Sequence, residues 1–222
     1  MCGRFTLTVD PGDLQEAYSG VVVPTGIAAR YNIAPTQPVA VIPNTEDSRL
    51  DFYVWGLIPS WAKDPEIGSR MINARAETLA EKPSFRNSFR RKRCLILADG
   101  FYEWKQSESS KTKQPMYIYM KNRKPFAFAG LWDLWHAPDG SEVYSCTIVT
   151  TEPNELLKTI HNRMPVILPQ TAYPAWLEPT EQNPASLAHF LKPYPPEEMA
   201  AHPVSRLVNS PQVDRIECIQ PV

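Results

Sequence analysis

The residue whose position most directly offers chemistry is Cys2, which carries a thiol one residue from the start of the chain. Methionine aminopeptidases remove Met1 when the next side chain is small, and the product would carry an α-amine and a thiol on one residue. The thiolate is a strong nucleophile, and an α-amine with a pKa of about 7.7–8.0 is partly neutral near pH 7. This pair condenses with an aldehyde to a Schiff base, which the thiol closes into a five-membered thiazolidine. The alternative is that a cysteine at the second codon is accidental.

Glu103 is a candidate acid–base group because of its aromatic neighbours. It lies between Tyr102 and Trp104, in the segment Ala-Asp-Gly-Phe-Tyr-Glu-Trp at 98–104, which follows an apolar run and contains an Asp-Gly turn signal. A carboxylate held among rings is partly desolvated, which raises its pKa and suits it to proton transfer. The alternative is a surface glutamate on a strand whose neighbours are packed.

His161 and Arg163 lie together in Ile-His-Asn-Arg-Met-Pro at 160–165, between a helical pattern and an apolar strand. A loop that brings a histidine and an arginine into one pocket would suit acid–base catalysis beside a phosphate. The alternative is a histidine at a helix end that satisfies backbone carbonyls.

An amide, a guanidinium and a carboxylate follow one another at two-residue spacing, at Asn73, Arg75 and Glu77. On an extended segment these three side chains would project from one face. There Asn73 could fix a ribose or a base edge, and Arg75 could hold a phosphate. The alternative is a salt-bridged edge strand.

The net charge of −1 over 222 residues hides an uneven distribution. Residues 70–93 carry a local charge of +6, and a basic face of this kind can bind phosphates whatever the total charge. Its eight basic residues are Arg70, Arg75, Lys82, Arg86, Arg90, Arg91, Lys92 and Arg93, opposed by Glu77 and Glu81. Trp61, in a proline-bounded loop, is a candidate stacking platform for unpaired bases. The alternative for the basic run is a solvated helix surface.

The sequence disfavours metal, disulfide and membrane roles. The four cysteines are widely spaced, and neither C-x-x-C nor H-x-x-x-H occurs, so we expect no metal site and no cofactor. No apolar run approaches the roughly 20 residues of a membrane helix, and Arg4 and Asp10 interrupt any signal-peptide pattern. We expect a monomeric cytoplasmic protein, associated with the nucleoid during replication, or a nuclear one in a eukaryote. Disulfides are not expected in these reducing compartments.

The 23 prolines are dispersed and many close short apolar runs, which suits short strands joined by rigid loops. We expect a single domain over residues 1–222 with an α+β fold, built around a twisted, largely antiparallel, barrel-like β-sheet with peripheral short helices. The expected strands are 39–42, 52–55, 94–98, 116–120, 126–131, 144–150 and 166–168. The expected helices are 13–18, 76–81 with a continuation toward Phe89, 152–160, 171–177 and 184–191.

Taken together, these segments resemble the SOS-response-associated peptidase (SRAP) family. The matching motifs are Met-Cys-Gly-Arg-Phe at 1–5, Tyr-Asn-Ile-Ala-Pro at 31–35, Trp-Gly-Leu-Ile-Pro-Ser-Trp at 55–61, Ile-Asn-Ala-Arg-Ala-Glu at 72–77, Phe-Arg at 85–86, Ala-Asp-Gly-Phe-Tyr-Glu-Trp-Lys at 98–105, His-Asn-Arg-Met-Pro at 161–165 and His-Pro-Val-Ser at 202–205. Eight motifs in family order, across nearly the whole chain, make the resemblance specific.

The resemblance implies a sensor and shield of abasic sites in single-stranded DNA. In the family, the residue matching Cys2 forms a thiazolidine crosslink with the ring-opened abasic deoxyribose. By motif position, Asn73 would hold the N-terminal residue or the sugar, Glu103 would act as acid–base, and His161 would protonate the sugar oxygen and help in reversal. The implied DNA-binding residues are Arg4, Asn32, Pro35, Trp61, Arg75, Arg86 and Arg163. The family's autopeptidase activity would act on residues before Cys2, where this sequence has only Met1.

Two other functions stay open at the level of the sequence. An N-terminal-nucleophile amidohydrolase also uses a terminal cysteine, with its own α-amine as base, but it would need neither the basic stretch nor Trp61. A non-catalytic single-strand binding module would bind intact and abasic strands equally, and Cys2→Ala would change nothing. A purely structural domain would not require the ordered set of motifs.

Overall fold

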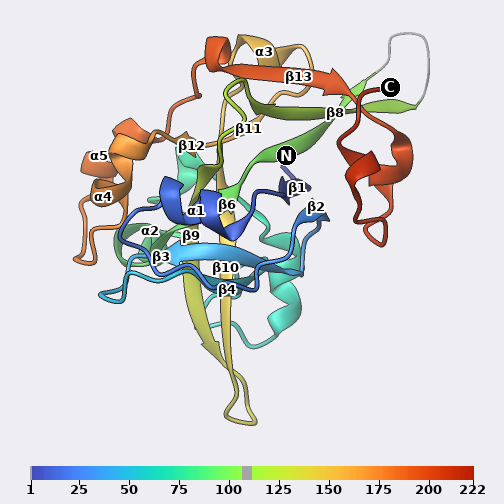
Figure 1. Cartoon of the computed structure of the whole chain (residues 1–222). Helices are drawn as coiled ribbons and strands as arrows, with labels where there is room; N and C mark the ends of the chain where they lie inside the picture. The colour runs from blue at the N-terminus through green and yellow to red at the C-terminus, as the bar shows by residue number, and fades with distance from the viewer. Residues whose placement is uncertain (1, 107–111) are drawn as a thin grey trace.

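The larger of two sheets closes into a barrel (Figure 1). The computed structural model describes residues 2–106 and 112–222. Five strands pair in a ring, because β9 pairs with both β6 and β10. Their order is β10 (Glu142–Thr151), β4 (Asp51–Trp55), β3 (Pro38–Pro43), β6 (Arg93–Ala98) and β9 (Phe126–His136). Three short strands extend the ring: β11 (Met164–Pro165) and β5 (Asn73–Arg75) on β10, and β12 (Ile167–Leu168) on β9.

The smaller sheet carries the N-terminus of the chain at its interior. Its order is β13 (Met199–Pro203), β8 (Lys113–Met120), β7 (Gly100–Gln106), β1 (Phe5–Leu7) and β2 (Arg30–Ile33). Every pair in it is antiparallel. In the barrel, β10 runs parallel to β4 and to β5, and the other pairs are antiparallel. The expected α+β fold around a twisted, largely antiparallel, barrel-like sheet is therefore confirmed.

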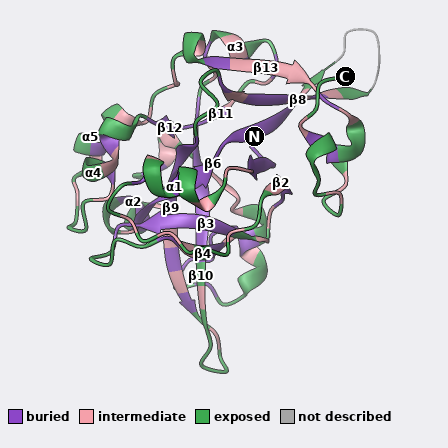
Figure 2. Ribbon diagram, in the orientation of Figure 1, coloured by how far each residue is buried: buried purple, intermediate pink, exposed green. Residues whose placement is uncertain are grey.

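The two sheets share one hydrophobic core, which Figure 2 shows as buried strands beneath an exposed periphery. Phe5 of β1 joins them, because its ring makes edge contacts with Trp55 at 5.1 Å and with Phe128 at 5.6 Å between ring centroids. All three side chains are fully buried. Burying such rings is worth several kcal/mol, which holds the first strand against the barrel.

Helices lie at the periphery and are short. The α-helices are α1 (Pro11–Ala17), α2 (Arg86–Arg91), α3 (Glu155–Lys158), α4 (Tyr173–Trp176) and α5 (Pro184–Leu187). The 3-10 helices are η1 (Pro65–Arg70), η2 (Ala76–Thr78), η3 (Gln170–Ala172), η4 (Ala188–Phe190), η5 (Pro196–Glu198), η6 (Arg206–Asn209) and η7 (Ile216–Cys218). Within the described ranges, none has the length and apolar character needed to cross a bilayer. The expected helix from Ala76 toward Phe89 is wrong: a 3-10 turn and a later α-helix replace it, with Pro83 between them.

Each expected strand overlaps an observed one, but six strands of the described chain were not expected. The unexpected strands are β1, β2, β5, β7, β11 and β13. Most are short and lack the β-branched runs that indicate a strand. The Asp-Gly signal at 99–100 marks only a corner, because β6 ends at Ala98 and β7 begins at Gly100.

The basic stretch 70–93 divides between surface and interior. Arg90 and Arg91 both form ion pairs with Glu181, at 2.7 Å, and Lys92 pairs with Asp133 at 2.6 Å. Arg93 is fully buried, and its guanidinium donates to five backbone carbonyls. These carbonyls belong to Trp176, Phe89, Arg90, Glu178 and Thr180. The C-terminal end of the stretch thus stabilises the fold, and only its earlier part is left as a candidate DNA-binding face.

We predict that Arg93→Met lowers the free energy of unfolding by about 3 kcal/mol, because several buried carbonyls would lose their donors. Arg91→Met is the matched control, since the Arg91 side chain is half exposed and pairs only at the surface; it should change stability by less than about 0.5 kcal/mol. Urea unfolding at pH 7 measures both. Equal midpoints for the two variants would contradict this role of Arg93.

Candidate active site

Strand β1 brings the start of the chain to β7. The two strands are antiparallel, with Phe5 opposite Phe101, and the Tyr102 amide donates to the Arg4 carbonyl at 3.0 Å. Continuing this register toward the N-terminus places Gly3 opposite Glu103, so that Cys2 lies one residue further on. Cys2 is fully buried, and the side-chain amide of Asn73 donates to its carbonyl oxygen at 2.8 Å. Two of the four predicted catalytic residues are therefore in direct contact.

Asn73 reaches Cys2 because β5 runs parallel to β10. In this pairing Asn73 lies opposite Ile148, and Ala74 points into the core with no exposed surface. Asn73 and Arg75 thus share the opposite face, as expected for an extended segment. Glu77 does not join them, since it lies in the 3-10 helix η2.

Glu103 is a buried carboxyl on β7, only 2 % exposed. Burial raises its pKa to about 7, because the charged form loses hydration. Such a group exchanges a proton readily near neutral pH. The alternative of an exposed surface glutamate is therefore wrong for this residue.

The Cys2 thiol is protonated in this environment. Burial raises its pKa well above the ordinary range, and the negative charge of Glu103 adds to the rise. A hydrogen bond from the Arg4 backbone opposes it. Since a thiolate is the effective nucleophile, sulfur attack in this site requires that a base remove the thiol proton, and Glu103 is a carboxylate close enough to affect that thiol.

His161 completes the cluster from the loop between α3 and β11. Its Nε2 lies 3.9 Å from a carboxylate oxygen of Glu103. The Arg163 amide donates to Nδ1 at 3.1 Å, so this hydrogen bond assigns the proton of the neutral ring to Nε2, on the side of Glu103. Burial lowers the pKa of His161, which favours that neutral form. The ring can then donate a proton from Nε2.

Arg163 is half-buried, and its guanidinium is already paired. It binds both carboxylate oxygens of Glu77, at 2.7 and 3.0 Å, and donates to the Thr150 carbonyl at 2.7 Å. Interaction with Arg163 lowers the pKa of Glu77. The salt bridge considered for this segment therefore exists, with Arg163 as the cation.

Three predicted DNA-binding residues are exposed near the cluster or beside a surface hollow. Trp61 is 59 % exposed and, with Arg86, lines a hollow of about 440 Å³ that Ser60 and Asp133 also border. Arg75 is exposed at the end of β5. Pro35, in the loop after β2, is half-buried. An exposed ring beside guanidinium groups is the arrangement that single-strand binding uses.

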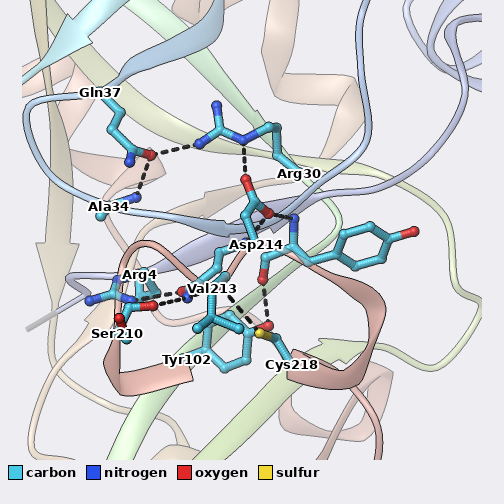
Figure 3. Close-up of polar contacts among 11 residues, drawn as sticks. Arg4, Arg30, Ala34, Gln37, Tyr102, Ser210, Val213, Asp214 and Cys218 are labelled. Carbon is cyan, nitrogen blue, oxygen red and sulfur yellow. Dashed lines mark hydrogen bonds and ion pairs between the residues drawn. The ribbon is translucent and has the colours of Figure 1, made fainter. Parts of the chain in front are cut away.

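Two further predicted DNA-binding residues, Arg4 and Asn32, are not exposed at the surface. Both are buried, and one nitrogen of Arg4 donates to the Asn32 side-chain oxygen at 2.7 Å and to the Val208 carbonyl at 2.6 Å. Figure 3 shows Arg4 beside Ser210 and Val213 of the C-terminal segment. A DNA contact of these two residues therefore stays a prediction, and the structure shows their side chains bonded to each other and to the protein's own backbone.

The C-terminal carbonyls that receive these bonds were missed by the sequence reasoning. They belong to Val208, Ser210 and Val213. A backbone carbonyl carries no residue identity, so no pattern in this segment could reveal its role. Among the described residues, no group of three or more histidine, cysteine, aspartate or glutamate side chains is arranged to hold a metal ion.

The raised pKa of Glu103 predicts a pH-dependent stability. Between about pH 4.5 and 7 the folded chain keeps a proton that the unfolded chain releases, so rising pH costs stability across that window. Relative to wild type, Glu103→Gln should therefore gain up to about 3 kcal/mol of unfolding free energy between pH 4.5 and 7, and no more above it. Urea unfolding of both proteins across this range measures the difference. Parallel pH profiles would contradict a buried carboxyl with a raised pKa.

Comparisons with known proteins agree with this arrangement. The family model described as "SOS response associated peptidase (SRAP)" matches residues 1–211. The chain is 49 % identical over 223 residues to "Abasic site processing protein YoqW" of Bacillus subtilis (strain 168), covering 99 % of both chains. It is 31 % identical over 264 residues to "Abasic site processing protein HMCES" of Xenopus tropicalis, covering 99 % of this chain and 78 % of that one. A crystal structure of a Bacteroides thetaiotaomicron protein superposes with a TM-score of 0.87 at 30 % identity, over 100 % of each chain.

Proposed function

Because this chain belongs to the SRAP family, we propose that it processes abasic sites in single-stranded DNA by forming a covalent bond to them through Cys2. Relatives that match over nearly the whole chain carry the name abasic site processing protein. The observation that carries the proposal is the buried cluster in which Asn73 holds Cys2 and His161 faces Glu103. An amidohydrolase would need none of the exposed basic and aromatic groups beside it.

The reaction begins with the α-amine of Cys2, once Met1 has been removed. The nitrogen adds to C1′ of the ring-opened deoxyribose aldehyde, and loss of water gives an imine. The Cys2 sulfur then bonds to the same carbon, the C=N electron pair moves to nitrogen, and a thiazolidine forms. The thiol proton passes to Glu103 and from there to the ring nitrogen, so the step is balanced without a further reactant.

His161 assists at the sugar. An abasic deoxyribose is mostly a closed ring, and the aldehyde appears only when the ring oxygen accepts a proton. The Nε2 proton of neutral His161 lies on the Glu103 side of the ring, where the sugar would bind. The same proton transfer, run in reverse, would let the crosslink open again.

The DNA strand is held mainly by sequence-independent contacts. Arg75 and Arg86 would bind phosphates, and Trp61 would stack on an unpaired base. Pro35 would line the path of the strand. The Arg163 side chain is paired with Glu77, and its backbone amide donates to the His161 ring. Arg163 would therefore lie at the edge of the DNA path and orient His161.

The covalent proposal is tested on a denaturing gel. Protein whose loss of Met1 is confirmed by mass spectrometry is mixed with single-stranded DNA that holds one abasic site. We expect a covalent band that is absent with the intact strand and absent with Cys2→Ala. Glu103→Gln should slow its formation about 100- to 10,000-fold, as is usual for loss of a general acid–base group.

A folded protein with a free N-terminal cysteine that gives no band would contradict the proposal. Turnover of a small amide by that protein would favour the amidohydrolase instead. Equal binding of intact and abasic strands with no effect of Cys2→Ala would favour a non-catalytic binding module.

We predict that Arg86→Gln weakens binding to intact single-stranded DNA and lowers the slope of log K against log salt by about 0.7, the loss of one phosphate contact. Arg91→Gln is the matched control, because its guanidinium is paired with Glu181. Fluorescence anisotropy over a salt series measures both slopes. If Arg91→Gln lowers the slope as much as Arg86→Gln does, the DNA face is wrongly assigned.

A further inference from the structure

The C-terminal segment, residues 204–219, packs against the strands that carry Cys2 and Glu103. Val204, Val208 and Cys218 of this segment are fully buried and form a second small core with Tyr102 and Tyr117. In Figure 1 the segment runs beside β1, β2 and β8 near the N-terminus. The segment is thus far from the N-terminal strand in sequence and in contact with it in space.

One part of the segment holds the chain just after Cys2. The Arg4 guanidinium donates to the Val208 carbonyl at 2.6 Å, and Asn32, which also binds Arg4, donates to the carbonyls of Ser210 at 2.9 Å and Val213 at 2.6 Å. Both polar side chains are buried. Without the segment, a buried cation and a buried amide would lose their acceptors, which is strongly unfavourable.

Arg4 is also in contact with Cys2 through its backbone, which hydrogen-bonds the thiol. Cys2 lies before the first residue of β1, so the regular ladder of the sheet does not hold it. The described contacts that fix residues 2–4 are the Asn73 bond to Cys2, the Tyr102 bond to Arg4, and the side-chain bonds of Arg4. Displacing Arg4 would therefore displace the nucleophile.

Another part of the segment holds both neighbours of Glu103. The Trp104 indole donates to the side-chain oxygen of Asn209 at 2.8 Å. Tyr102 packs against the segment and donates its hydroxyl to the Tyr31 carbonyl at 2.7 Å. The segment thus contacts the strand of the nucleophile and the strand of the acid–base group together.

Asp214 fastens the segment to β2. One carboxylate oxygen accepts from the backbone amides of Tyr31 at 2.6 Å and Asn32 at 3.0 Å, and the other accepts from the Arg30 side chain. Figure 3 shows Asp214 between Arg30 and the β2 backbone. Hydrogen bonds to a charged carboxylate are stronger than neutral ones, so Asp214 contributes to the polar fastening of this end of the chain.

We propose that the C-terminal segment, fastened by Asp214, is a positioning element of the reactive site, and that Arg4 and Asn32 act through it rather than on DNA. The inference rests on the proposed crosslinking function. A displacement of about 1 Å in a reacting group costs up to about 100-fold in rate. Loosening the segment should therefore slow the chemistry while leaving DNA binding intact.

The direction in which the crosslinking rate changes when Asp214 is replaced distinguishes a positioning role from an electrostatic one. Asp214 is negatively charged, so its removal should tighten DNA binding or leave it unchanged. If the charge alone mattered, crosslinking would be at least as fast. Positioning predicts the opposite, a slower reaction on DNA that is bound as well as before.

The test compares Asp214→Ala, Asp214→Asn and Glu217→Ala, which all lose one negative charge. Asparagine keeps an oxygen that can accept from Tyr31 and Asn32. Glu217, exposed like Asp214 and in the same segment, pairs with Arg215 at 3.5 Å and not with β2 among the described contacts. The single-turnover crosslinking rate at saturating abasic single-stranded DNA, the Kd for the intact strand and the thermal midpoint are measured for each. We expect a rate about 10- to 100-fold lower for Asp214→Ala, largely restored in Asp214→Asn and unchanged in Glu217→Ala, with Kd unchanged or lower throughout.

Folded Asp214→Ala that crosslinks at the wild-type rate would overturn the inference, as would Asp214→Asn that is as slow as Asp214→Ala. Asn209→Ala removes the bond to Trp104 and leaves Asp214 in place, and it should also slow the rate. That variant decides the matter if Asp214→Ala is unfolded at the assay temperature. A wild-type protein that forms no crosslink would instead overturn the proposed function on which the inference rests.

Discussion

The geometry of the candidate site depends on one constraint: the N-terminal strand β1 is held inside a sheet. β1 has only three residues, yet it lies between β2 and β7 and pairs with both. Phe5 supplies the apolar anchor on the barrel side, and Arg4 supplies a polar anchor on the other. Cys2 lies beyond the last paired residue and is held by Asn73. The placement of this short strand fixes where Cys2 lies relative to Asn73.

Burial then determines the proton chemistry. The same low-dielectric surroundings raise the pKa of Glu103 to about 7 and keep the Cys2 thiol protonated. A standing thiolate would be exposed to oxidation and to adventitious electrophiles. In the mechanism proposed above, the buried thiol becomes nucleophilic when Glu103 accepts its proton during the reaction. The burial of Glu103 that lowers stability thus also gives this carboxyl a pKa that suits proton transfer.

The sequence predicted the barrel strands well where they are continuous apolar runs, as in Cys94–Ala98, which is buried throughout. It failed for strands such as β1 and β13, whose pairing is decided by partners remote in sequence rather than by local preference. The candidate catalytic residues were accessible from residue type and motif order, and the structure brings Asn73 to Cys2 and His161 to Glu103. The assignment of Arg4 to DNA could not be checked from sequence, because its partners are the Asn32 side chain and a backbone carbonyl of the distant C-terminal segment, that of Val208.

The central claim is that both the nitrogen and the sulfur of Cys2 bond to one carbon of the abasic sugar. The most direct measurement is carbon NMR of the complex formed with single-stranded DNA labelled with ¹³C at C1′ of the abasic site. The account predicts a tetrahedral carbon bonded to nitrogen and sulfur, with the signal lost when Cys2 is replaced by serine. A trigonal imine carbon, or the signal of the free sugar in a protein with an unblocked N-terminal cysteine, would contradict it.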